Sequence, residues 1–185
     1  MSPRGRKLAL VAHVGSSAGW LGAVVTSLVL AVLALASNEA PVVRAVYLVL
    51  EPLGWYTLIP FSLAALLTGL IQSLGTSWGL LRHYWVLAKL LMNLFATAIL
   101  LLYMQTLTFL ADTARTTAAI GDVDALRNPS PVLHAVAAVA LLLVALVLSV
   151  YKPRGQTGYG QRRQSQQRAR PDTTATRTAP TAPVR

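Results

Sequence analysis

The stretch LALVAHVGSSAGWLGAVVTSLVLAVLALA, residues 8–36, decides the fold of this 185-residue chain. The stretch is 29 residues long and contains no Asp, Glu, Lys or Arg. A helix needs about 20 mainly apolar residues to cross the hydrocarbon core of a bilayer. The apolar residues are continuous, whereas the strands of a membrane barrel alternate apolar and polar residues. This stretch therefore predicts a membrane-spanning helix.

The same stretch has two features of a cleaved secretory signal. Arg4, Arg6 and Lys7 precede it, and it ends in Ala-Leu-Ala at positions 34–36, which resembles a cleavage site. The apolar region of a signal peptide, however, is only about 7–15 residues long. Because this region is nearly twice that length, we expect an uncleaved span.

Three further apolar runs, at residues 53–74, 84–110 and 132–151, meet the same length requirement. The whole chain is 55% hydrophobic and 12% charged, whereas a soluble domain has about 25% charged residues. The sequence thus predicts an all-α protein, with an integral membrane four-helix bundle over residues 1–151. Residues 152–185 are rich in Gln, Arg, Thr, Ala and Pro and predict a disordered, basic cytoplasmic tail.

The net charge of +10 is distributed unevenly around these runs. Twelve Lys and Arg flank one side of the predicted bundle. The other side has three Arg and five of the six acidic residues. Basic residues concentrate on the cytoplasmic side of membrane proteins. We therefore expect a multi-pass protein of the cell (inner, cytoplasmic) membrane with both termini in the cytoplasm. The expected partners are the lipid bilayer and other membrane proteins or a second copy of the chain, not nucleic acid.

Ionisable side chains inside a predicted span are candidates for function. His13 lies six residues beyond Lys7, and Lys89 lies seven residues beyond Arg82. At 1.5 Å per residue these separations are about 9 and 10 Å, so the two groups are expected at similar depth. Trp20 falls on the same helical face as His13 and needs a partner for its indole ring. The sequence therefore predicts a cofactor site formed by His13, Lys89 and Trp20, without a metal-ion site of its own.

The same residues have structural interpretations that the sequence leaves open. Lys89 can extend toward the nearby interface and keep its charge in water. His13 can be a hydrogen-bonded structural histidine. The chain has no cysteine, which excludes disulfides, thiolate metal sites and Cys nucleophiles. No catalytic residues are predicted, and the sequence does not decide whether the protein is an enzyme.

Three groups of residues, one in each of the first three predicted spans, resemble a group of small bacterial membrane proteins: His13-(x)6-Trp20-x-Gly22, Phe61-Ser62-x-Ala64…Thr68-Gly69 and Trp85-(x)3-Lys89-Leu90. The group contains the copper-resistance CopD-like domains, the HemJ-type protoporphyrinogen oxidases and a related family of uncharacterised integral membrane proteins. The chain resembles the uncharacterised family most, in an actinobacterial style of sequence. The resemblance covers the four spans and implies b-type haem held by His13 and Lys89.

Two departures separate the chain from the HemJ-type pattern. Residues 25–35 are plain and apolar where that pattern has a Leu-Pro-Arg-Leu-like stretch, and Tyr103 is followed by Met104 where it has a Tyr-His pair. The resemblance therefore implies haem or porphyrin binding rather than the oxidase activity. Two alternatives stay open. One is a non-catalytic membrane scaffold or interaction protein, and the other is transport of copper or a small solute.

Overall fold

A computed structural model of the chain describes residues 2–75, 84–116, 126–151, 157 and 161–162. Its elements, in chain order, are α1 (Pro3–Ala36), α2 (Ala40–Leu53), the π-helix η1 (Gly54–Leu58), α3 (Ile59–Gly75), α4 (Tyr84–Thr116) and α5 (Ser130–Tyr151). The described residues form helices and short connections and no strand. This result confirms the predicted all-α fold.

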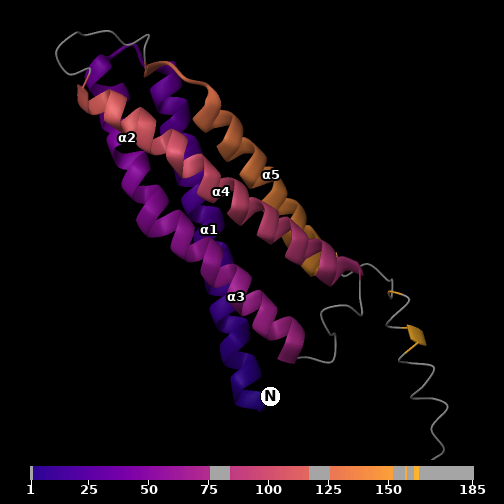
Figure 1. Cartoon of the computed structure of the whole chain (residues 1–185). Coiled ribbons are helices and arrows are strands. Elements are labelled where there is room, and N and C mark those ends of the chain that lie inside the picture. Colours follow the sequence, from indigo (N-terminus) through magenta and orange to yellow (C-terminus); the bar gives the residue numbers. More distant parts are fainter. Residues whose placement is uncertain (1, 76–83, 117–125, 152–156, 158–160, 163–185) are drawn as a thin grey trace, which may run out of the picture.

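Four of these helical stretches are long and apolar enough to cross a membrane: Pro3–Ala36, Ala40–Gly75, Tyr84–Thr116 and Ser130–Tyr151. The second stretch joins α2, η1 and α3 end to end. The helices run along one common axis (Figure 1). We name the ends after that view. The upper end carries Ala36, Ala40, Thr116 and Ser130, and the lower end carries Pro3, Gly75, Tyr84 and Tyr151.

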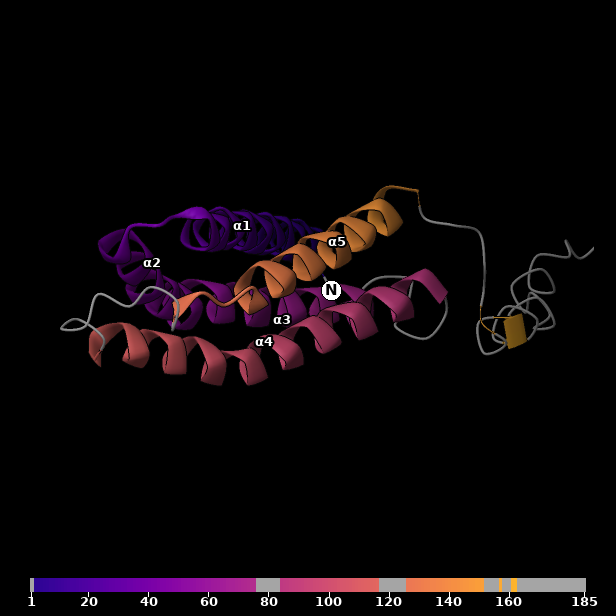
Figure 2. The ribbon, with the colours of Figure 1, turned by 90° about the horizontal axis from the view of Figure 1, so that it is seen from above.

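The four stretches form a ring in which α1 and α4 lie on opposite sides. Figure 2 shows α1 and α5 along one side, α4 along the other and the α2–α3 stretch between α1 and α4. Side-by-side packing joins α1 to α3 and α5, and joins α4 to α2, α3 and α5. At the lower end, α4 and α5 lie apart from α1 and α3 (Figure 1).

Two helices extend beyond their predicted bounds of 8–36 and 84–110. Helix α1 begins at Pro3 because the Ser2 hydroxyl accepts a hydrogen bond from the Gly5 N–H at 3.2 Å, and proline suits the first helical position. Helix α4 continues to Thr116 at the upper end. There Arg115 forms ion pairs with Asp112 on its own helix and with Glu51 on α2. The predicted cytoplasmic tail lies, apart from residues 157 and 161–162, outside the described part of the chain.

Helix α2 was not among the predicted spans, yet it packs inside the upper half of the bundle. Its buried residues, Val43, Val46, Tyr47 and Leu50, are at most 4% exposed. Their spacing of i, i+3, i+4 and i+7 gives a helix one apolar stripe. Two polar side chains tie this helix to its surroundings. The Tyr47 hydroxyl donates to the Leu126 carbonyl at 2.8 Å, and Arg44 Nε donates to the Ala114 carbonyl at 2.8 Å.

The π-helix η1 lies between two prolines, Pro52 and Pro60. Proline has no N–H, so Pro60 cannot bond the carbonyl four residues before it. Instead, the Ile59 N–H reaches the Gly54 carbonyl, five residues back. This wider turn brings the backbone of Gly54 close to the buried Met104 on α4. A Cβ on Gly54 would lie 2.6 Å from Met104 Sδ.

This close approach predicts opposite effects for two Gly→Ala substitutions. Gly54→Ala is expected to lower the melting temperature of the detergent-solubilised protein, because overpacking a filled core costs about 1–3 kcal/mol. Gly22→Ala is the matched control. Its Cβ would meet nothing within 4 Å, and alanine is favoured over glycine inside a helix by about 0.5–1 kcal/mol. Equal or higher stability of Gly54→Ala in the same detergent would contradict the described packing.

Candidate functional site

His13 lies in the lower half of α1 and is bound to α3. Its Nδ1 lies 3.1 Å from the Ala65 carbonyl oxygen and 3.1 Å from Thr68 Oγ1. A carbonyl oxygen only accepts hydrogen bonds, so Nδ1 carries the hydrogen and the neutral ring has its lone pair on Nε2. The imidazole rests against Gly69, where an added Cβ would lie 3.1 Å from its Cε1. The local sequence Thr68-Gly69 thus provides both the bond and the space for this ring.

Lys89 lies in the lower half of α4 and is bound to α5. Its ammonium donates to the Ser149 hydroxyl and lies 6.0 Å from the centre of the Trp85 ring. Cation–π contacts extend to about 6 Å, so Trp85 also stabilises this charge. The residue is part-buried. Lys89 therefore joins two helices within the bundle.

The structure brings two of the three predicted site residues into the same half of the bundle. His13 and Lys89 are on helices at opposite sides of the ring, and their hydrogen bonds run to different neighbours, α3 and α5. A site shared by the two residues remains a prediction.

Trp20, the third predicted site residue, lies about 10 Å further along α1 than His13, at 1.5 Å per residue. It is 3% exposed and lines an apolar pocket in the middle of the bundle. The pocket is partly open and has a cavity volume of about 140 Å³. Residues from all four stretches line it, among them Val24 of α1, Leu58 of η1, Leu100 of α4 and Ala138 of α5. We name this space the central pocket.

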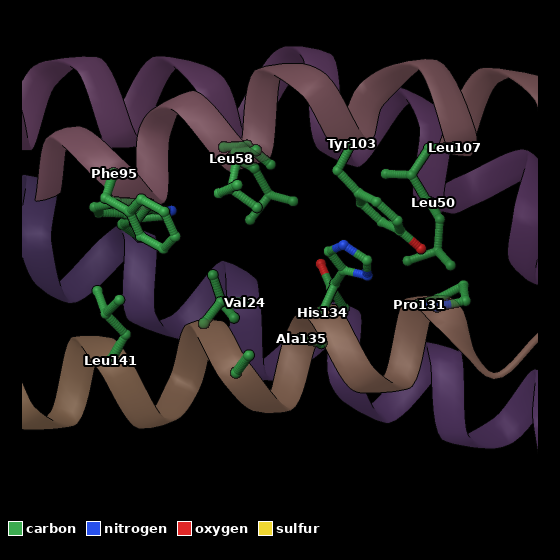
Figure 3. Close-up of a pocket in the computed structure, with 17 residues that line it drawn as sticks. Val24, Leu50, Leu58, Phe95, Tyr103, Leu107, Pro131, His134, Ala135 and Leu141 are labelled. Atoms are coloured by element: carbon green, nitrogen blue, oxygen red, sulfur yellow. The ribbon is translucent and has the colours of Figure 1, made fainter. Parts of the chain in front are cut away.

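Two polar side chains that line the central pocket, Tyr103 and His134, lie at its upper end. Figure 3 shows the rings of Tyr103 and His134 facing each other there, while Phe95 and Leu141 lie at the opposite end. The two ring centres are 3.9 Å apart, with an angle of 17° between the planes. Ser130 holds both rings. Its hydroxyl donates to the Tyr103 oxygen at 3.3 Å, and its carbonyl lies 2.9 Å from His134 Nδ1.

Sequence reasoning assigned neither Tyr103 nor His134 to a site. The spacing of Ser130 and His134, four residues apart at the start of a helix, was a weak signal for their mutual bond. The stacking of His134 on Tyr103 could not be predicted from the sequence, because it depends on which face of α4 meets α5. The ring of His134 is exposed at the mouth of the pocket.

One buried polar group lacks a partner. The Thr97 side chain is 4% exposed, and within the described ranges its hydroxyl forms no hydrogen bond. In the same ranges, no group of three or more His, Cys, Asp or Glu side chains could hold a metal ion. The structure therefore offers no cluster of that kind in support of copper transport.

The chain was compared with known protein families, curated proteins and solved structures. None of them matches it.

Proposed function

We propose that the chain is a multi-pass membrane protein that binds a lipid-soluble small molecule in the central pocket. The observation that carries this proposal is the pocket itself, an apolar space with a cavity volume of about 140 Å³ lined by four membrane-length helices. Ligand sites are concave and mostly apolar, with a few polar groups that orient the ligand. The Tyr103 and His134 side chains that line the upper end, both held by Ser130, fit that description.

The route into the pocket supports a ligand that arrives from the bilayer. Phe95 lines the lower part of the pocket and is also 60% exposed on the outer surface of the bundle. The exposed large apolar residues of this surface would face lipid tails in a membrane. A ligand dissolved in the hydrocarbon could therefore enter sideways between helices without crossing water.

A photoactivatable fatty alcohol tests this proposal in nanodiscs of phosphatidylcholine. We expect labelling of pocket residues that saturates and that excess hexadecanol prevents. Ala138→Phe should reduce this labelling at least tenfold, because the new ring fills the pocket. Ala140→Phe is the matched control, since Ala140 is exposed on the same helix and does not line the pocket. Non-saturable labelling that is equal in both variants would contradict the proposal and favour a scaffold role.

The proposal also places the protein in the cytoplasmic membrane with both termini in the cytoplasm. The unequal distribution of basic residues supports this orientation. The chain has no cysteine, so labelling of a single introduced cysteine shows the accessibility of that one position.

We expect a membrane-impermeant maleimide to label Glu39→Cys in intact cells, because Glu39 is exposed at the upper end. Ser2→Cys, at the lower end, should react only after the cells are permeabilised. The reverse pattern would show that the chain is inserted in the opposite orientation.

A second candidate function is the binding of b-type haem through His13. The geometry of His13 supports it, because a ligating histidine commonly donates its other ring N–H to a carbonyl oxygen, as Nδ1 does to Ala65. His13 Nε2 would hold the haem iron, and Lys89, once it has lost its proton, is the candidate for a second residue that holds it. Bound haem would supply one-electron redox chemistry.

An absorption titration with haemin tests this second candidate. In the purified protein we expect the Soret absorbance of bound haem to rise until one equivalent of haemin has been added. His13→Ala should show no such rise. His134→Ala should keep the band, because His134 lies at the other end of the bundle. If the unmodified protein develops no Soret band, or if His13→Ala retains it, His13 does not ligate haem.

A further inference from the structure

We infer that the central pocket selects an uncharged ring headgroup that carries oxygen atoms, the chemistry of a quinone or its quinol. The headgroup would lie at the upper end, against Tyr103 and His134. This inference rests on the proposed function and specifies its ligand. It follows from the hydrogen-bonding groups that remain available, from the charges of the lining and from the shape of the pocket.

The upper end presents one donor and one acceptor. Because the Ser130 hydroxyl donates to the Tyr103 oxygen, the hydrogen of the tyrosine hydroxyl remains available for a ligand. The Ser130 carbonyl accepts from His134 Nδ1, so the lone pair of the neutral ring is on Nε2. A ligand carbonyl would accept from Tyr103, and a ligand hydroxyl would donate to His134. Quinones present carbonyl oxygens and quinols present hydroxyl groups.

The lining excludes a charged headgroup. The residues around the pocket include no Lys, Arg, Asp or Glu. Burial of an unpaired carboxylate or phosphate among these apolar residues, with no Lys or Arg to compensate, is strongly unfavourable. Fatty acids, phospholipids and the propionates of a porphyrin therefore fit this lining poorly. A neutral headgroup avoids this penalty.

The shape favours a flat ring with an apolar chain. The stacked Tyr103 and His134 rings present a flat aromatic surface at the upper end, and aromatic rings prefer stacked or edge-to-face partners. From Leu107 to Phe95 the pocket follows α4 for 12 residues, or about 18 Å at 1.5 Å per residue. At the exposed Phe95 the chain of the ligand would leave the bundle toward lipid.

Competition against the photoactivatable fatty alcohol tests this inference, with decylubiquinone and hexadecanol as competitors. In the unmodified protein we expect decylubiquinone to compete at a concentration at least tenfold lower than hexadecanol. Tyr103→Phe should remove most of this preference while hexadecanol still competes, which shows that the pocket is intact. His134→Gln should weaken competition by the reduced quinol. Tyr56→Phe removes the hydroxyl of a residue that is 82% exposed and does not line the pocket, so it should change nothing.

Two outcomes separate this inference from the proposed function. If decylubiquinone competes no better than hexadecanol, or if Tyr103→Phe keeps the preference, the headgroup assignment is wrong. The proposed binding of a lipid-soluble molecule would then still hold. If the fatty alcohol does not label the pocket at all, the proposed function fails first.

Discussion

The bundle depends on hydrogen bonds that single polar side chains make across helices in an apolar surrounding. Hydrocarbon offers no partner to a polar group, so the partners must come from within the protein. Several of these partners are backbone carbonyls. Gln72 donates to Ala9, Arg44 to Ala114 and Tyr47 to Leu126, each at 2.8 Å. Such bonds fix the rotation of each helix about its axis, which apolar contacts with lipid-like side chains leave nearly free.

The prolines of the second stretch decide where this network leaves space. Pro52 and Pro60 bracket the π-helix and remove two backbone donors from its neighbourhood. The wider turn brings Gly54 against Met104 and directs Leu58 toward the middle of the bundle. Leu50 and Leu58 then line one side of the central pocket. A π-turn inside a helix often accompanies a functional site, and here it shapes the wall of the pocket.

The apolar runs were sufficient to predict an all-α chain with four membrane-length helices, because length and hydropathy are local properties of the sequence. The predicted ends were less accurate. Helix α1 begins earlier because of the Ser2 cap, and α4 ends later because Arg115 pairs with Glu51 across the bundle. Helix α2 was missed as part of a span. The spacing of its stripe at 43, 46, 47 and 50 is present in the sequence, but residues 41–50 are interrupted by Arg44 and are too few to indicate a span by themselves.

The candidate sites show the same limit more clearly. The spacing predicted a similar depth for His13 and Lys89, and both lie in the lower half of the bundle, but their partners could not be predicted. Every residue has a backbone carbonyl, so the sequence does not show that the carbonyl of Ala65 is the partner of His13. Ser149, the partner of Lys89, is one of many small polar residues. The need of Trp20 for a partner was readable, whereas the pocket around it was not. A pocket is the space that several helix faces leave between them, and no single face specifies it.

The two candidate sites lie at different levels, and this separation constrains what the protein does. His13 and Lys89 occupy the lower half, and the polar end of the central pocket lies at the upper end, beside Ser130. On α1 about 10 Å separates His13 from Trp20 at 1.5 Å per residue, and the pocket continues upward from there. One small ligand cannot contact both polar groups. If both sites bind ligands, the bundle therefore holds two molecules, one above the other along its axis.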